Sequence, residues 1–223
     1  MKKKLLMGLA LVLFTAQTAL AVPVYWTDWF SATTGASGSA EGKILLPGFS
    51  IAVNYSGDVT FAQLGTGTNY WTQGTPAPYT GNAVVDNAPT PAEMIALSRS
   101  NVVNTLTFSH PLNKPVMAIV SMGQPGLPVS YDFNQPFTVL SEGRGYWGDG
   151  SYTLAAGDIL TGRELHAAIQ LDGRVSSISW TESPGEYWHG ITVGATAVPE
   201  PATMVLLGSG LFGIIGLRKK NKQ

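Results

Sequence analysis

The sequence contains no cysteine among its 223 residues. This absence excludes a disulfide framework, thiolate metal ligands and a cysteine nucleophile, so a buried core must stabilise the fold. Histidine is also scarce, and His110, His166 and His189 have no visible triad partners around them. No G-x-S-x-G nucleophile motif occurs either. Nucleophilic catalysis therefore has no support in the sequence.

Charge is sparse, at 12% of residues, whereas glycine (26) and proline (14) are frequent. This composition favours a β-rich, turn-rich protein over a helical one. The basic residues gather at the two ends, in Lys2–Lys4 and in Arg218–Lys222. Between the ends, six basic residues face 13 acidic ones, a net charge of −7. Nucleic acid is excluded as a partner, because phosphate neutralisation needs an excess of lysine and arginine.

Residues 1–21 are typical of a secretory signal peptide. Lysines at positions 2–4 precede an apolar stretch, Leu5–Phe14, which is too short to span a membrane. Ala19 and Ala21 then form an A-x-A cleavage site for signal peptidase, which predicts Val22 as the first mature residue.

Residues 198–223 hold three features in a fixed order. The triplet Pro199, Glu200 and Pro201 comes first, an uncharged apolar run at 202–217 follows, and a basic tail at 218–223 ends the chain. The run predicts a transmembrane helix of about 24 Å, which the basic side chains can extend toward the lipid headgroups.

This order of triplet, apolar span and basic end resembles the PEP-CTERM sorting signal of Gram-negative bacteria. The resemblance implies processing by an exosortase, a membrane-embedded enzyme that recognises the Pro-Glu-Pro triplet. It also implies a bacterium that produces extracellular polysaccharide, with this protein in its matrix or on its surface. Because basic clusters stay cytoplasmic, both terminal segments place residues 22–197 outside the inner membrane. The expected location is the inner membrane first and the cell surface or extracellular space after processing.

The central residues 22–197 show strand patterns nearly throughout. Alternation at 51–56 followed by Gly57-Asp58 predicts a hairpin into Val59 and Phe61, and Arg163–Trp180 predicts a second hairpin through the Asp172-Gly173 turn. Pro115–Met122 is continuously apolar, as in a central strand covered on both faces. Further strands are expected at 25–32, 106–109, 137–140 and 187–194.

One helical signal and one long loop interrupt these strands. Thr90, Pro91 and Glu93 form an N-cap pattern that predicts a short helix or 3₁₀ turn over about 91–98. Residues 65–87, rich in glycine and proline, predict a long surface loop. Together the segments predict an all-β fold, a single β-sandwich of jelly-roll type. Gly145–Gly148 and Glu186–Gly190 are similar to segments in the globular regions of other PEP-CTERM proteins, which also implies a sandwich.

Aromatic residues near polar groups suggest carbohydrate binding. Trp147 lies in a glycine-rich loop with neighbours too small to bury it, Trp188 is on the strand face opposite His189, and Tyr70-Trp71 begins the long loop. Flat aromatic faces beside carboxylates suit the C–H face and hydroxyls of a sugar. Trp26, Trp29 and Trp180 are instead expected in the core.

Metal and cofactor motifs are weak. Glu182, Glu186 and His189 are close in sequence, but Ser183-Pro184-Gly185 interrupts the helix that would bring them together. Asp149 and Asp158 are weak calcium candidates in turns. The glycines of 208–213 match the dinucleotide pattern but fall inside the predicted membrane span, where they favour close helix packing. No cofactor is therefore expected.

The histidines are assigned structural roles. His110 is expected in a turn, His166 on a solvated strand face, and His189 in a buried, hydrogen-bonded position. The sequence thus predicts a non-enzymatic structural or adhesive sandwich sorted by an exosortase. A lectin-like module for exopolysaccharide is the first alternative. A polysaccharide hydrolase, which needs two facing carboxylates about 5–10 Å apart, is the second.

Overall fold

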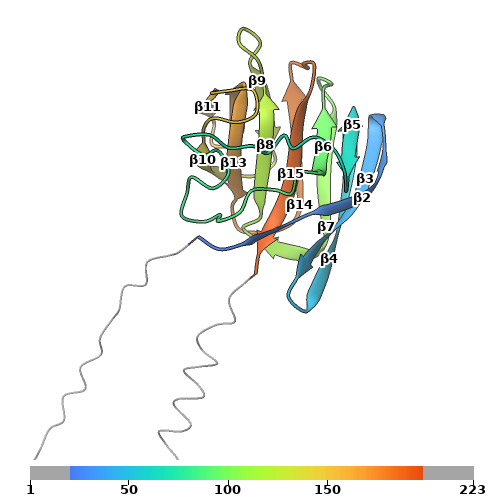
Figure 1. Cartoon of the computed structure of the whole chain (residues 1–223). Helices are drawn as coiled ribbons and strands as arrows, with labels where there is room; N and C mark the ends of the chain where they lie inside the picture. Colours follow the sequence, from blue (N-terminus) through green and yellow to red (C-terminus); the bar gives the residue numbers. More distant parts are fainter. Residues whose placement is uncertain (1–20, 198–223) are drawn as a thin grey trace, which may run out of the picture.

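Two packed β-sheets make up residues 21–197, the part of the chain that this computed structural model describes (Figure 1). All pairings between neighbouring strands are antiparallel. In chain order the strands are β1 (Val24–Trp26), β2 (Asp28–Thr33), β3 (Gly35–Leu46), β4 (Phe49–Val59), β5 (Phe61–Leu64), β6 (Glu93–Leu97), β7 (Val103–Asn113), β8 (Val116–Met122), β9 (Val129–Phe133), β10 (Phe137–Glu142), β11 (Ser151–Ala155), β12 (Ile159–Arg163), β13 (Leu165–Leu171), β14 (Arg174–Ser183) and β15 (His189–Thr196). The all-β prediction is confirmed, and two sheets fit the predicted sandwich.

The first sheet has the order β10-β13-β8-β15-β6-β5, with β1 paired to β15, and the second has the order β11-β12-β9-β14-β7-β4-β3-β2. Their facing surfaces enclose the main core, in which Trp29 and Trp180 are 1% exposed. Trp26 is also buried, at 8% exposed. The core positions predicted for these tryptophans are confirmed.

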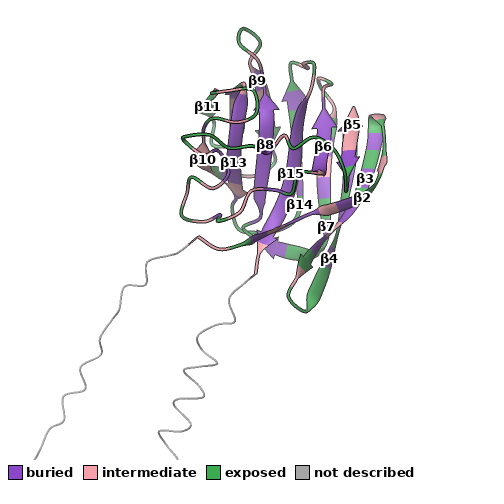
Figure 2. Ribbon diagram, viewed as in Figure 1, coloured by how far each residue is buried: buried purple, intermediate pink, exposed green. Residues whose placement is uncertain are grey.

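The first sheet is buried on its other face as well. The segment from 65 to 92 crosses this outer face and inserts Trp71, Tyr79 and Val85 against side chains of β6, β8 and β13. Figure 2 shows the central strands β13, β8, β15 and β6 of this sheet buried along most of their length behind the crossing loop. The predicted loop is therefore present, but it covers a sheet and is not confined to the surface.

The segment from 65 to 92 buries the outer face of the central strands, so these strands are covered on both faces. All seven residues of β8 are buried, which confirms the strand predicted from its continuous apolar sequence. In β13, however, His166 and Ala168 are 0% exposed, so the prediction of a half-buried strand with His166 in solvent is wrong. The alternation of residue types was real, but distant loop residues bury the second face.

The helix predicted over 91–98 is wrong, because residues 93–97 form strand β6. All five of its side chains are buried between β5 and β15. Glu93, expected to cap a helix, instead accepts a hydrogen bond from the Trp29 backbone N–H at 2.6 Å. Burial on two faces and pairing on two edges outweigh a local capping signal.

The predicted hairpin at 163–180 is also wrong, although both strands exist. β13 belongs to the first sheet and β14 to the second, so Asp172-Gly173 passes between the sheets. The backbone N–H of Asp172 bonds to the carbonyl of Pro136, and the Gly173 carbonyl accepts the N–H of Lys114. These contacts hold a corner where a tight turn was expected.

Gly57-Asp58 is not the expected hairpin turn either. β4 continues through both residues, and a Cβ at Gly57 would lie 2.4 Å from Asn104 Oδ1, so only glycine permits this close approach. Asp58 is 0% exposed and its carboxylate accepts the backbone N–H groups of Ser98 and Arg99. These bonds fix the point where the chain leaves the second sheet for β5 in the first.

Strands β8 and β15 run in opposite directions between the two ends of the sandwich. Gly190 pairs with Val120 at one end, and Gly194 pairs with Val116 at the other. We call the end near Gly190 the far pole. The end near Gly194, where Val24 pairs with Thr196 and both ends of the described chain leave the sheets, is the near pole (Figure 1).

The predicted signal peptide, apart from Ala21, and the predicted sorting segment lie outside the described residues. Ala19 and Pro199–Pro201 are among these residues, as are the apolar runs at 5–14 and 202–217. Within 21–197, no helix has the length and hydropathy needed to cross a bilayer.

Candidate functional site

A cleft opens at the far pole, between the end of β8, the residue that joins β12 to β13, and the segment before β15. Its volume is about 280 Å³, at the small end of ligand pockets. We call it the far-pole cleft; it is lined by Ser121, Gly123, Gln124, Trp147, Glu164, Glu186, Tyr187 and Trp188.

Aromatic residues that are distant in sequence meet beside this cleft. Tyr70 stacks on Trp147 with ring centroids 5.2 Å apart, and Trp188 meets both rings edge-on at 5.0 and 5.1 Å. Tyr146 completes the cluster, 4.6 Å from Trp147. The structure thus brings together three of the four aromatic residues singled out for sugar binding.

The fourth, Trp71, lies apart from them. It is 2% exposed and packs edge-on against Tyr79 in the cover over the first sheet. Trp71 therefore belongs to the fold, and its selection as a ligand-contacting residue is corrected. Tyr187 was not predicted as a binding residue, but it lines the cleft and is 84% exposed. Trp147 itself is 44% exposed.

Ser121 and Glu164 form a strained pair on one side of the cleft. Their φ angles are 61° and 54°, in the left-handed region that residues with a Cβ rarely adopt. The Ser121 hydroxyl donates to the Glu164 carboxylate at 2.5 Å, and the Glu164 N–H bonds to the Gly123 carbonyl. Such strain costs about 1–3 kcal/mol per residue and is typical of functional sites.

Glu164 is a poor anion in this position. Burial raises its pKa above the ordinary carboxyl value, the nearby charge of Glu186 adds to this rise, and the hydrogen bond from Ser121 opposes it. His166 offers little compensation, since its Nε2 lies 3.7 Å from the carboxylate and burial lowers its pKa to about 4. At neutral pH the imidazole is uncharged, so it supports the site as a packing group.

Two hydrogen bonds hold the Glu186 carboxylate, one from the backbone and one from a buried histidine. Its Oε1 accepts the Gly123 N–H at 2.7 Å and the His189 Nδ1–H at 2.7 Å. The other ring nitrogen of His189 lies 3.4 Å from Oε2 of Glu182, which is 0% exposed. His189 is buried and hydrogen-bonded as predicted.

No helix joins these three residues, as expected from Ser183-Pro184-Gly185, but the fold brings them together without one. The turn after β14 brings the two glutamates to opposite sides of the His189 ring. Because the two ring nitrogens point in opposite directions, the donors do not converge on a single point as a metal ion requires. The array is a buried row of charges that leads from the core to the cleft.

The charges in this row favour a protonated histidine. Burial opposes the imidazolium, but Glu182 and Glu186 outweigh it, so the pKa of His189 is raised. Burial raises the pKa of Glu182 to about 7, with His189 opposing the rise. Glu182 therefore gains and loses its proton around neutral pH.

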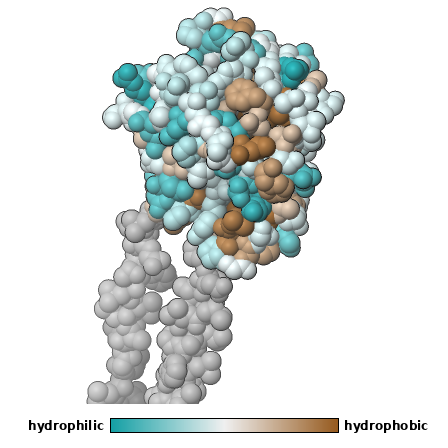
Figure 3. Space-filling view, turned by 45° about the vertical axis from the view of Figure 1, so that its right-hand side comes forward, coloured by the Kyte–Doolittle hydropathy of each residue, from teal (hydrophilic) through white to brown (hydrophobic). Residues whose placement is uncertain are grey.

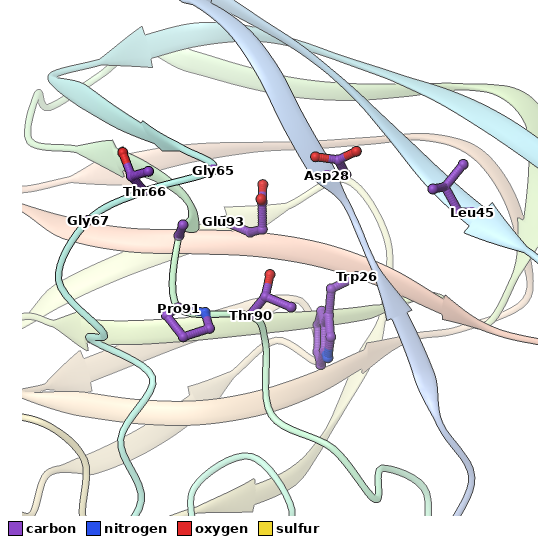
Figure 4. Close-up of a pocket in the computed structure, with 10 residues that line it drawn as sticks. Trp26, Asp28, Leu45, Gly65, Thr66, Gly67, Thr90, Pro91 and Glu93 are labelled. Carbon is purple, nitrogen blue, oxygen red and sulfur yellow. The ribbon is translucent and has the colours of Figure 1, made fainter.

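A second hollow of about 570 Å³ lies beside β2 and β6. Figure 4 shows Asp28 and Glu93 on it, with glycine-rich backbone at 65–67 along one edge. Burial raises the pKa of Glu93 to about 7, and Asp28 adds to the rise. Asp28 is offset by Lys43, which lies 3.4 Å away. Both carboxylates already have partners in the fold.

The weak calcium candidates do not meet. Asp149 is in the loop after Trp147, and Asp158 is in the turn between β11 and β12, where its carbonyl accepts the Phe133 N–H. Within residues 21–197, no group of three or more His, Cys, Asp or Glu side chains is arranged to hold a metal ion.

Comparison with known proteins concerns the C-terminal segment that follows β15. The family model described as the PEP-CTERM protein-sorting motif matches residues 197–220. The chain carries a PEP-CTERM motif. The match confirms the resemblance carried by Pro199, Glu200 and Pro201, and the motif begins one residue after β15 ends. Neither the curated proteins nor the solved structures contain a match to this chain.

The PEP-CTERM motif makes this an exported protein, anchored in the membrane and then sorted to the surface by an exosortase. The motif follows β15 at the near pole, whereas the cleft opens at the far pole. The candidate site and the sorting segment are thus at opposite ends of the same strand.

Proposed function

We propose that this exported PEP-CTERM protein is a non-enzymatic polysaccharide-binding protein whose far-pole cleft holds a sugar unit of an extracellular polymer. The observation that carries the proposal is the convergence of the aromatic cluster with two carboxylates. Tyr70, Trp147 and Trp188 are in mutual contact, and Glu164 and Glu186 line the same cleft. Aromatic rings match the C–H face of a sugar, and the partly exposed Glu164 carboxylate can accept a sugar hydroxyl hydrogen.

The charge of the site favours a neutral polymer over an acidic one. Both charged side chains that line the cleft are glutamates, and the central part of the chain carries a net charge of −7. A uronic acid or sulfated sugar would bring like charge to Glu186, which costs free energy. Binding that relies on stacking and neutral hydrogen bonds also changes little with salt.

Hydrolysis also uses two carboxylates, but the carboxylates of this cleft are poorly arranged for hydrolysis. The Glu186 side chain is 2% exposed, and its Oε1 already accepts two hydrogen bonds. A carboxylate that must activate water or attack a sugar carbon needs a free oxygen directed at the substrate. We therefore place binding, and not bond cleavage, at this site. A purely structural sandwich without a ligand is the alternative that the experiment below separates.

The test is affinity electrophoresis of the full-length protein, in detergent, through gels containing a neutral or an acidic exopolysaccharide. We expect retardation in the neutral polymer, and Tyr187→Ala or Trp147→Ala should each weaken it about tenfold, as for an aromatic contact worth about 1.4 kcal/mol. Phe30→Ala is the matched control, because Phe30 is an exposed aromatic residue (56%) away from the cleft.

Two outcomes would overturn the proposal. Migration unaffected by any polymer would favour the purely structural role. Release of reducing ends that disappears in Glu164→Gln would replace binding by hydrolysis.

A further inference from the structure

The near pole carries an apolar surface that the cleft does not explain. A groove of about 370 Å³ runs between the β3–β4 hairpin tip and the end of β15, and its lining includes Leu46, Pro47, Phe49, Leu112 and Ala195. Phe49 is 44% exposed. In Figure 3 hydrophobic side chains gather at the lower end of the domain, beside the point where the described chain ends. We call this surface the near-pole patch.

The length of chain beyond the structure limits what can cover this patch. Ala197 lines the groove, and the apolar run predicted to span the membrane begins at residue 202. At about 3.3–3.6 Å per residue, the five steps from residue 197 to residue 202 reach at most about 18 Å. While the chain is anchored, the near-pole patch is therefore held within this distance of the bilayer surface.

Charge at the same pole is compatible with lipid headgroups. Arg174 pairs with Asn113, which lines the groove, and Lys114 bonds through its N–H to Gly173. These are two of the six basic residues in the central part of the chain, and Asp172 is the acidic residue in the same corner. Basic side chains beside exposed apolar ones favour the surface of an anionic membrane.

We infer that the near-pole patch rests on the lipid surface while the protein is anchored, with the β3–β4 hairpin tip in the headgroup region. The inference rests on membrane anchoring and is independent of what the cleft binds. Its consequence is orientation: the near pole faces the membrane, the Pro-Glu-Pro triplet is held at the lipid surface, and the cleft points away from it.

Because the chain has no cysteine, one introduced cysteine can report the environment of a chosen site. We would reconstitute full-length Pro47→Cys, labelled with an environment-sensitive nitrobenzoxadiazole dye, into protein-free vesicles of phosphatidylcholine and phosphatidylglycerol. Leu127→Cys is the matched control, since Leu127 is a surface residue (37% exposed) in the loop that follows Gln124 of the cleft. The expected result is a blue-shifted emission at position 47 that headgroup spin-labelled lipid quenches, and a water-like, unquenched emission at position 127.

The variant Phe49→Asp, labelled at position 47, should lose the blue shift and the quenching while its far-UV circular dichroism is unchanged. Water-like emission at position 47 in the parent chain would overturn the inference. A blue shift without quenching by lipid would overturn it as well, and would identify a second copy of the chain as the cover. Neither result touches the polysaccharide assay, so the two proposals fail separately.

Discussion

Glu186 and His189 are hydrogen-bonded across 2.7 Å, which connects a residue of the far-pole cleft to the buried core. Replacing the ring by His189→Phe would leave Glu182 and Glu186 without their shared cation. We expect the free energy of unfolding at pH 8 to fall by about 3–5 kcal/mol, the usual cost of removing one member of a buried ion pair.

This cost should shrink at pH 5. Glu182, whose pKa is about 7 in the intact protein, is then protonated and no longer needs a cation. Urea unfolding at both pH values measures the difference. His110→Phe is the control, because His110 is exposed and contacts only the ring of Phe49 edge-on among the aromatic side chains. An equal loss of unfolding free energy at the two pH values would contradict the charges assigned to Glu182 and His189.

Glu93 gives the protein a pH-dependent stability. Its pKa in the folded state is about 7, against 4.5 ordinarily, so folding retains a proton that the unfolded chain releases. The resulting stabilisation is complete below pH 4.5 and is lost as the pH rises to about 7. We expect Glu93→Gln to reduce the decrease in unfolding free energy over this interval by about 3 kcal/mol.

Glutamine keeps an oxygen that can accept the Trp29 N–H, so this variant removes the titrating carboxyl group and keeps the hydrogen bond. Chemical unfolding at a series of pH values is the measurement, and Glu41→Gln on the exposed side of β3 is the control. Identical pH profiles for Glu93→Gln and the parent protein would show that Glu93 does not take up the proton.

Trp71 should stabilise the fold without contributing to binding. It is 2% exposed, and Trp71→Ala removes a large side chain from the cover over the first sheet. The expected loss in unfolding free energy is about 3–5 kcal/mol. Trp147→Ala changes a 44% exposed site, so it should lower the unfolding free energy much less than Trp71→Ala. It should weaken retention by the polysaccharide more. Comparing thermal unfolding with affinity electrophoresis for the two variants checks this division; a Trp71→Phe protein that folds normally yet fails to bind would refute it.

We predict that sorting depends on the triplet at 199–201. We expect Glu200→Ala to leave an unprocessed, membrane-retained species when the full chain is expressed with an exosortase, because the motif matched at 197–220 loses its single acidic residue. Immunoblotting of membrane and secreted fractions measures this, with Thr203→Ala in the same segment as control. Processing of Glu200→Ala at the parental rate would show that the exosortase does not recognise the carboxylate.

Local sequence patterns predicted where strands lie better than which sheet they join. β8 was predicted from its apolar run, and β13 and β14 were both predicted as strands. The corner at Asp172-Gly173 was missed because alternation reports which face a side chain takes and does not report the partner strand. The helix at 91–98 was predicted from a local cap, whereas β6 exists because β5 and β15 lie on its two edges.

The candidate site was only half visible in the sequence. Tyr70, Trp147 and Trp188 could be selected because aromatic residues beside glycines and polar groups are a compositional signal. Glu164 and Ser121 could not, since their left-handed backbone and mutual hydrogen bond depend on how β8 and β13 end at the same pole. His166 was misjudged because the loop that buries it is about 90 residues away, as shown by its contact with Tyr79.

The position of β15 has a mechanical consequence. This strand leads directly into the sorting segment at one end, begins at His189 beside the cleft at the other, and is paired with β8 on one side and with β6 and β1 on the other. A polymer pulling on the cleft while the membrane holds the tether would load the strand along its own length. Its ladder hydrogen bonds would then resist in shear, all together, where an edge strand pulled sideways would separate one bond at a time.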